Sequence, residues 1–376
     1  MPAAVEVVGP YRGSTGYDRH TRELVRHFVQ LGTEVQLHHL DGWSQPLPDD
    51  ARETWFDELH RPVGAGVLLH FTMPTQARPR NGIRNVNYTM FEADRIPGVW
   101  AARAADHDCT VVPTESSRQA WIAGGVAPDR VRVSPLGVDA EFFGAASPPL
   151  ALHVPDGREV CAFRRRFLNI ADLRPRKNHL GLLRCWIRAT RADDDAVLIV
   201  KTNPLNAAML DTFRGDVDAM QRHLGRTLDE AAPVVFLPAT VTNEQLRGLY
   251  RSATHYISLS LGEGWDQAAM EAAAAGLQLV APRHSAYAAW LCDDEAELID
   301  ATAVPADFEG RAGAEDRVWF DGARWWRPDE DAASDCIRRI IDGSTAAKQL
   351  PRQRIARDYS WSAAARSLLW ILDETL

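Results

Sequence analysis

Residues 256–284, YISLSLGEGWDQAAMEAAAAGLQLVAPRH, contain the pattern that decides the fold. The opening run YISLSL is short and apolar, with β-branched and aromatic members, and it predicts a buried strand. Two glycines interrupt this run, and strong helix formers follow until Gly276, which stands where a helix usually ends. A second apolar run occupies residues 277–281. The order strand, glycine turn, helix and strand is one step of a parallel α/β sheet.

Two carboxylates lie in the glycine turn and on the opening turns of the helix. Glu263 follows the first strand, and Glu271 comes after seven intervening residues. Free backbone N–H groups at the helix start, residues 265–268, can hold phosphate oxygens. Because two carboxylates would repel a phosphate, we expect them to accept hydrogen bonds from ribose or sugar hydroxyls. An ordinary solvated pair of acids is the alternative, and the flanking glycines and buried strands favour a binding site.

This stretch resembles the E-x7-E signature of retaining nucleotide-sugar glycosyltransferases of the GT-B fold, family 4. The usual form is close to EGFGLPxLEAMAxGxPVIA, and this chain has EGWDQAAMEAAAAGLQLVA. It departs from that form at Asp266, Gln267 and Ala268, where the family's backbone meets the transferred sugar. The resemblance implies that the donor is bound by Glu263, Gly264, Trp265, Asp266 and Glu271.

The length and composition are typical of a soluble globular chain with two domains. Its 376 residues are long for one domain, and 45% hydrophobic with 25% charged residues allow a large core. The formal net charge of −9 argues against nucleic-acid partners and allows at most peripheral contact with anionic membranes.

The cysteines and the termini bear on the compartment. Five scattered cysteines, at positions 109, 161, 185, 292 and 336, form no CxxC pair. This usage indicates buried thiols in a reducing compartment rather than disulfides or a zinc site. The N-terminus lacks the basic and apolar segments of a signal peptide, and no run is long enough to span a membrane. We therefore expect a cytoplasmic protein.

The N-terminal residues predict a second strand–helix–strand step, with a strand at 5–8, a helix at 17–31 and a strand at 35–40. A dinucleotide site with Asp41 as the ribose acid is a rival interpretation, but the glycines do not match GxGxxG. The family begins in the same way, so the resemblance implies that Gly16 lies near the donor phosphate and Tyr17 near the acceptor. For Tyr17, a plain turn before a helix is the alternative.

Two further candidates follow predicted strands of the first domain. His70 lies at the end of the run 66–71, one residue before its last residue, and Glu92 follows the run 86–91. The carboxyl ends of parallel strands are where α/β sheets bind ligands, so we expect both residues on the acceptor side, with Glu92 also a catalytic candidate. The alternatives are a structural histidine and, for Glu92, a local salt bridge.

The second domain is predicted to open with a strand at 164–171, followed by the turn DLRPRKN. The family has GRLxPxKG here, and its Arg and Lys grip the diphosphate. Lys177 matches the Lys, whereas Asp172 replaces the Arg, so Arg174 or Arg176 would supply the missing charge. Fixed cations at this point would stabilise the charge that the leaving diphosphate gains.

Other loops of the second domain complete the implied donor site. By resemblance, the loop with Thr240 and Val241 packs on the nucleobase, and Lys201 at a strand end lies near the nucleotide. The run Asp193–Asp195 is a possible metal site, but its place between a helix and a strand favours a solvated turn. The family needs no such metal, so we expect no metal and no cofactor beyond the nucleotide sugar.

The predicted fold is α/β, with two Rossmann-like domains facing across a cleft as in GT-B proteins. We expect an N-terminal acceptor domain at 1–145, a linker rich in proline and glycine at 144–158, and a donor domain at 159–356. Residues 357–376 should form a helix that packs back on the N-terminal domain. Residues 301–335 look like an insertion with several tryptophans.

The resemblance implies transfer of a sugar, with retention, from a UDP- or GDP-linked donor to a hydroxyl of a carbohydrate or small-molecule acceptor. Lys177, Glu263 and Glu92 are the catalytic candidates, and Arg176 supports the donor. The leaving phosphate is expected to help deprotonate the acceptor, since no nucleophile is evident. A nucleotide-sugar epimerase on a similar fold and a non-catalytic nucleotide-sugar-binding homologue are the alternatives.

Overall fold

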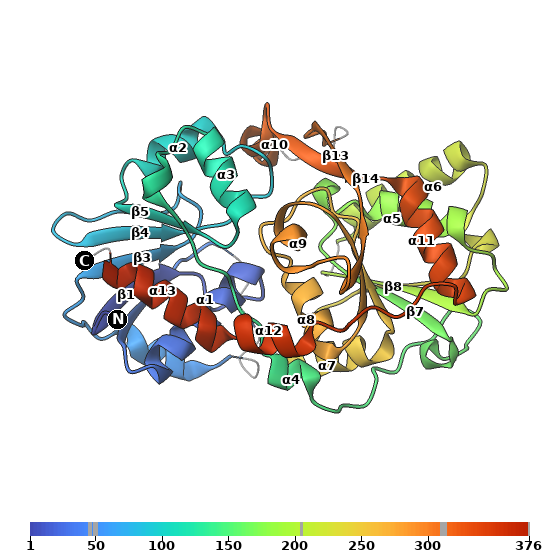
Figure 1. The fold of residues 1–376 in the computed structure, drawn as a ribbon, viewed down its shortest axis with the longest axis horizontal. Helices are drawn as coiled ribbons and strands as arrows, with labels where there is room; N and C mark the ends of the chain where they lie inside the picture. Colours follow the sequence, from blue (N-terminus) through green and yellow to red (C-terminus); the bar gives the residue numbers. More distant parts are fainter. Residues whose placement is uncertain (44–46, 48–51, 204–205, 309–313, 375–376) are drawn as a thin grey trace. The chain divides into compact units, whose positions relative to one another are not determined.

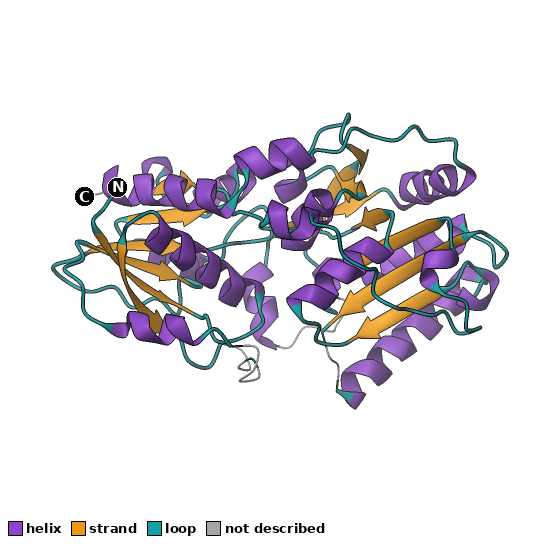
Figure 2. Cartoon of the chain, turned by 90° about the horizontal axis from the view of Figure 1, so that it is seen from below, coloured by secondary structure: helices purple, strands orange, loops and turns teal. Residues whose placement is uncertain are grey.

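The computed structural model describes the chain except for residues 44–46, 48–51, 204–205, 309–313 and 375–376. It divides into two compact units (Figure 1). Unit 1 contains residues 1–138, 314–324 and 356–376, and unit 2 contains residues 139–313 and 325–355. Each unit is built on one six-stranded sheet whose strands lie beside helices (Figure 2). The predicted α/β architecture with two Rossmann-like units is confirmed.

Unit 1 has a parallel sheet in the order β2-β1-β3-β4-β5-β6. Its strands are β1 (Ala4–Gly9), β2 (Glu34–His39), β3 (Val67–Phe71), β4 (Arg84–Tyr88), β5 (Cys109–Val112) and β6 (Val131–Val133). Its helices are α1 (Gly16–Gln30), α2 (Gly98–Ala104), α3 (Glu115–Ala123), α10 (Ala314–Phe320) and α13 (Trp361–Glu374).

The start of α1 is fixed by a capping box. The Thr15 hydroxyl accepts a hydrogen bond from the Asp18 backbone N–H, and the Asp18 carboxylate accepts one from the Thr15 backbone. This reciprocal pair satisfies N–H groups that the first turn leaves open. Beyond it, Leu24, Val25 and Phe28 turn one apolar face of the helix into the core.

Part of the predicted insertion 301–335 belongs to unit 1. Within residues 314–324, the Phe320 ring stacks on Phe91 with 5.2 Å between ring centroids. The Asp94 backbone N–H donates to the Arg324 carbonyl at 3.1 Å, and the Arg324 N–H donates to the Asp94 carboxylate at 2.7 Å. A segment distant in sequence thus closes on the loop after β4.

The last residues of the chain also belong to unit 1, where α13 packs against α1. The Val138 N–H donates to the Tyr359 carbonyl at 2.8 Å. A Cβ on Gly137 would lie 2.6 Å from the Trp361 backbone, so the approach of the two segments requires glycine.

Unit 2 has the sheet order β12-β11-β10-β7-β8-β9, also parallel. Its strands are β7 (Arg165–Ile170), β8 (Ala196–Thr202), β9 (Val234–Pro238), β10 (His255–Ile257), β11 (Gln278–Pro282) and β12 (Ala296–Ile299), with a separate pair formed by β13 (Ala301–Pro305) and β14 (Arg324–Pro328). Its helices are α4 (Ala140–Gly144), α5 (His179–Ala189), α6 (Ala207–Leu224), α7 (Asn243–Ser252), α8 (Gln267–Ala275), α9 (Ser285–Trp290) and α11 (Glu330–Asp342), and α12 (Arg352–Asp358) runs across the division between the units.

Several boundaries differ from the sequence prediction. The division falls after residue 138 instead of in the expected linker 144–158. Strand β4 ends at Tyr88; the Thr89 N–H still bonds the Val111 carbonyl of β5, whereas the Met90 N–H bonds the Tyr17 hydroxyl at 3.0 Å. Strand β10 ends at Ile257, and the Leu261 N–H bonds the Arg176 carbonyl.

The cysteines are all free thiols, but only three of them are buried. Cys161 and Cys292 are exposed, contrary to the expectation that all five are buried. Among the described residues, no helix is long and apolar enough to cross a membrane.

Candidate functional site

The candidate site of unit 2 lies where the strand order of its sheet reverses. Strand β7 is followed in sequence by its neighbour β8, whereas its other neighbour, β10, comes much later in the chain. The carboxyl ends of two such strands form a crevice in which α/β proteins bind ligands. The loops leaving β7 and β10 join there, since the Leu261 N–H donates to the Arg176 carbonyl at 2.8 Å and the Asn178 amide donates to the Leu259 carbonyl at 2.9 Å.

A buried ion cluster connects these two loops. The Lys177 ammonium lies 2.6 Å from the Glu263 carboxylate, and the Arg176 guanidinium lies 3.2 Å from it. Glu263 is only 5% exposed. Burial alone would raise the pKa of Glu263, but the charges of Lys177 and Arg176 hold it below the usual range. Burial likewise opposes the charge of Lys177, and Glu263 raises its pKa overall, so both groups are ionised.

The two candidate arginines of the β7 loop have different roles. Arg176 joins the cluster and also donates to the Gly262 carbonyl. Arg174 is exposed and pairs with Asp172 at 2.8 Å. The cation that accompanies Lys177 is therefore Arg176, and Arg174 balances the acid that stands at the family's arginine position.

Asp266 is the N-cap residue of α8, a role that the sequence did not predict. Its backbone is left-handed, with φ 55° and ψ 76°, a region that asparagine and aspartate tolerate better than most residues. Its carboxylate accepts from the Ala269 N–H at 3.2 Å and from the Tyr287 hydroxyl at 2.5 Å. The carboxyl thus caps the N–H of Ala269, one residue beyond the N–H groups of residues 265–268 that the sequence predicts as a phosphate site, and it places an acid beside them.

The environment of Asp266 favours its neutral form. Burial and the nearby charge of Glu263 raise the pKa of Asp266 to about 6. The Tyr287 hydroxyl that donates to Asp266 also shares a hydrogen bond of 2.7 Å with Ser258. This chain of side chains fixes the carboxyl between α8 and α9.

Glu271 lies deeper in unit 2, on α8. It is 2% exposed and accepts from the Tyr250 hydroxyl of α7 at 2.9 Å. Gly264 and Trp265, which directly follow Glu263 in the sequence, are also buried. Lys201 at the end of β8 is 9% exposed, and burial lowers its pKa. Thr240 and Val241 lie between β9 and α7, Thr240 exposed and Val241 half-buried.

The remaining candidates belong to unit 1. Gly16 is the first residue of α1, and the Tyr17 hydroxyl accepts a hydrogen bond from the Met90 N–H at 3.0 Å.

His70 is 1% exposed, and its Nε2 hydrogen-bonds the Arg78 backbone. Burial lowers the pKa of His70 to about 4, so it is a neutral interior histidine. Glu92 is half-buried and follows the end of β4 by four residues, so it does not come directly after a strand as expected.

Some members of the site gave no signal in the sequence. The Ser285 hydroxyl accepts from the Glu263 N–H at 3.2 Å, and it also bonds Nδ1 of His284 at 2.8 Å. His284 Nε2 in turn bonds the Ser260 carbonyl at 2.8 Å. The left-handed φ of Ser285, 40°, marks it in the structure, but neither spacing nor composition distinguishes these residues beforehand.

The run Asp193–Asp195 lies in the turn between α5 and β8. Asp194 pairs with Arg338 at 2.7 Å and accepts from the Arg191 N–H, as expected for a turn. In the described part of the chain, no group of three or more His, Cys, Asp or Glu side chains is arranged to hold a metal ion.

The two units together have the fold of the GT-B glycosyltransferases. Sucrose-phosphate synthase from Thermosynechococcus elongatus matches with a TM-score of 0.67 and 15% identity, over 99% of this chain and 98% of that one. HepE from Anabaena, in complex with UDP-glucose, matches with a TM-score of 0.66 and 10% identity over 100% of both chains. The α,α-trehalose 6-phosphate synthase from Burkholderia multivorans matches with a TM-score of 0.61 and 13% identity, over 100% and 99%.

Within this fold the chain is similar to family 4, as its sequence indicated. Residues 191–368 match the family model described as family 4 glycosyltransferase in conflict systems. No curated protein sequence matches the chain. The matched residues contain Glu263, Asp266 and Glu271, whereas Lys177 precedes them.

Replacing Lys177 by methionine should destabilise the fold, because Glu263 would keep only Arg176 as a counter-charge. We expect the free energy of unfolding to fall by about 2–4 kcal/mol, since removing one partner leaves a buried charge under-compensated. Adding Glu263→Gln should restore more than half of the loss. Lys348→Met, which breaks a more exposed pair with Glu297, is the control and should cost about 1 kcal/mol or less. Denaturant unfolding measures all four proteins, and an unchanged Lys177→Met would contradict the assignment.

The raised pKa of Asp266 predicts a pH-dependent effect of Asp266→Asn. A neutral carboxyl stabilises the fold below the ordinary pKa of 3.8, and this contribution is lost as the pH rises through about 6. Asparagine keeps a neutral acceptor for Ala269 and Tyr287 and tolerates the left-handed backbone. The variant should therefore be more stable than the wild type by about 1–3 kcal/mol near pH 8, with no gain near pH 4.

Thermal unfolding across this pH range tests the prediction. Asp329→Asn, at the exposed start of α11, is the matched control and should show no gain at either pH. An equal effect of Asp266→Asn at both pH values would show that its charge is not the cause.

Proposed function

We propose that the protein is a retaining glycosyltransferase that moves a sugar from a UDP- or GDP-linked donor to the hydroxyl of a carbohydrate or small-molecule acceptor. The observation that carries this proposal is the buried cluster of Lys177, Arg176 and Glu263 at the strand-order reversal of unit 2. The UDP-glucose complex of HepE, a protein of the same fold, supports a nucleotide-sugar donor.

In this proposal the cluster binds the donor through complementary charges. Glu263 accepts hydrogen bonds from sugar hydroxyls, and Glu271 accepts them from the ribose. Lys177 and Arg176 face the diphosphate, which gains negative charge as the bond to the anomeric carbon breaks. Because Glu263 already fixes both cations, they need little rearrangement in the transition state.

The proposed transfer forms the new bond on the face from which the nucleotide leaves. The anomeric carbon–oxygen bond to the diphosphate breaks, and the acceptor oxygen bonds to the same carbon. The acceptor proton passes to an oxygen of the leaving phosphate, which needs no protein nucleophile. We propose Gly16 as a donor contact and Tyr17 and Glu92 as acceptor contacts. We do not propose His70 as an acceptor contact, because its Nε2 already bonds the Arg78 backbone in the interior of unit 1.

A non-catalytic nucleotide-sugar-binding protein is the second candidate. The observation that favours it is the Asp266 carboxylate at the start of α8, which would repel a phosphate there when ionised. Incubation of the purified protein with UDP- and GDP-sugars, with and without acceptors, separates the candidates. Transfer products support the glycosyltransferase, an isomerised donor without acceptor supports an epimerase, and binding without any product supports the second candidate.

Substitution of the two glutamates should separate binding from turnover. We expect Glu271→Gln to weaken donor binding and Glu263→Gln to lower kcat, since Glu271 would contact the ribose and Glu263 the reacting sugar. Loss of one charged hydrogen-bond partner costs about 1.5–3 kcal/mol, which corresponds to a change of roughly tenfold to a hundredfold.

Calorimetry with the donor and steady-state kinetics measure the two effects. Glu295→Gln is the control, because Glu295 is a buried glutamate that pairs with Arg354 away from the cluster. Equal kinetics for wild type, Glu263→Gln and Glu271→Gln would remove both residues from the site.

We further propose that transfer needs no metal ion, since Lys177 and Arg176 would neutralise the diphosphate charge. Activity should then be unchanged after treatment with EDTA. The measurement is the initial rate of transfer before and after chelation, with a magnesium re-addition arm. Loss of activity that magnesium restores would show that side chains of the protein hold a metal ion in addition to the two cations.

We also propose that the reaction takes place in the cytoplasm. All five cysteines are free thiols, as expected for a reducing compartment.

A further inference from the structure

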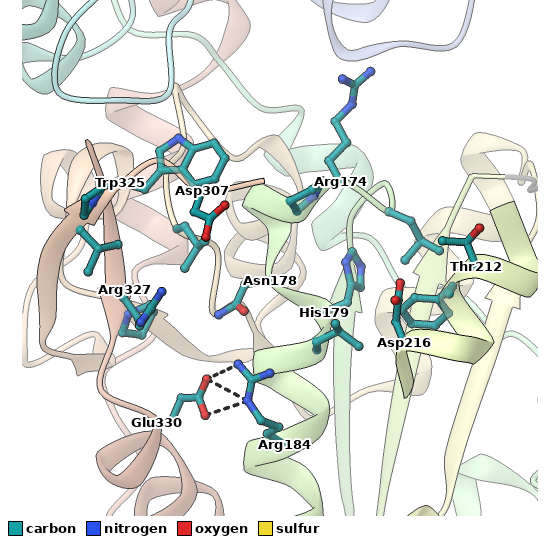
Figure 3. Close-up of a pocket in the computed structure, with 18 of the residues that line it drawn as sticks. Arg174, Asn178, His179, Arg184, Thr212, Asp216, Asp307, Trp325, Arg327 and Glu330 are labelled. Carbon is teal, nitrogen blue, oxygen red and sulfur yellow. Dashed lines mark hydrogen bonds and ion pairs between the residues drawn. The ribbon is translucent and has the colours of Figure 1, made fainter. Parts of the chain in front are cut away.

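Unit 2 contains a cavity of about 880 Å³ whose lining includes Arg174 and Leu261, from the same loops as the ion cluster (Figure 3). Its walls come from the loop after β7, from α5 and α6, and from the segments around β13 and β14. In Figure 3, Thr212 and Asp216 of α6 lie on one side of His179, and Asp307 and Arg327 lie on the other. The volume is within the range of sites for small molecules.

This cavity is distinct from the proposed donor site. Helices α5, α6 and α11 pack together, whereas α7 and α8 pack with each other and with α4. The cavity is lined from the first group, and the carboxylates Glu263 and Glu271 belong to the loop before α8 and to α8 itself. The cavity and the proposed donor site use different residues of the same loops. On the cavity side these residues are Arg174 and Leu261.

A buried histidine of the cavity wall has a ring nitrogen without a hydrogen-bond partner in the part of the chain that the structure describes. His179 is 5% exposed, and its Nε2 has no hydrogen-bond partner among the described residues. The other ring nitrogen is bonded to the Ala171 backbone, and burial lowers the pKa of His179 to about 4. The neutral ring therefore presents Nε2 as a lone pair. A buried polar atom without a partner is costly, so a ligand hydroxyl at this position would be stabilising.

The charges around the cavity are nearly balanced. Four arginines face five carboxylates in its lining. Arg184 pairs with Glu330 at 2.5 Å, and Arg188 lies 3.5 Å from the same carboxylate. This balance favours a neutral ligand over a phosphate or another anion.

Apolar surface adjoins these polar groups. The ring of Phe213 is half-buried in the lining of the cavity. Its centroid lies 6.4 Å from that of the His179 ring in an edge-on arrangement, and the ring also stacks on Phe236. A fixed aromatic ring beside carboxylates and an imidazole acceptor suits a molecule with both C–H faces and hydroxyls.

We propose that this cavity is a saccharide-binding site, separate from the site for the nucleotide-linked donor. Hydroxyls of the saccharide donate to His179 Nε2 and to the Asp216 carboxylate, and its C–H face packs on Phe213. The inference does not rest on the proposed transferase activity, since a saccharide could bind here in a protein without turnover.

Calorimetric titration of the full chain with three neutral trisaccharides, maltotriose, cellotriose and chitotriose, tests the proposal. We expect at least one of them to bind, and its affinity to fall by about tenfold or more in Phe213→Ala and in Asp216→Asn, the loss of an aromatic face or a charged acceptor. Asp218→Asn, an exposed position on the same helix, is the matched control and should bind as the wild type does.

Two further arms separate this site from the donor site. Saturating UDP and the Glu263→Gln variant should both leave trisaccharide binding unchanged. The proposal is overturned if none of the three sugars binds, if Phe213→Ala and Asp216→Asn bind normally, if UDP displaces the sugar, or if inorganic phosphate binds at this cavity instead. His179→Leu should also weaken binding, and circular dichroism checks that it folds.

Discussion

The carboxylate of Glu263 imposes the central constraint on unit 2. A charge that is 95% removed from solvent needs opposite charges at contact distance, and Lys177 and Arg176 supply them at 2.6 and 3.2 Å. Their loop must therefore stay against the end of β10, which the bond between Leu261 and Arg176 also enforces. This electrostatic requirement and the backbone bond together hold the two loops of the crevice against each other.

The chain uses lysine sparingly, and its placement is informative. Only three lysines occur, and arginine provides nearly all of the positive charge. A lysine at the cluster puts a compact ammonium beside Glu263, while the planar guanidinium of Arg176 also reaches the Gly262 carbonyl. Asp266 adds a second acid nearby, and burial together with the charge of Glu263 raises its pKa to about 6. The site thus combines one firmly ionised acid with one that titrates near neutrality.

The segment that looked like an insertion has two structural roles. Its residues 314–324 pack on the β4 loop of unit 1 through Phe320. Strands β13 and β14 remain largely in unit 2, where they provide a wall of the 880 Å³ cavity at His179. The same loops after β7 and β10 support both the ion cluster and this cavity. Different residues of these loops serve the two places, Glu263 in the ion cluster and Leu261 in the cavity wall.

The sequence by itself determined the two parallel α/β units, because apolar runs, helix formers and glycine stops are local signals. It also identified Lys177 and Glu263 as important, through residue type and spacing. Only the tertiary structure decided that they pair, since they are far apart in the chain and meet through sheet order. The Tyr287 partner of Asp266, the end of β4 at Tyr88 and the cavity at His179 likewise depend on contacts between distant segments. Such contacts leave no periodic trace in the sequence.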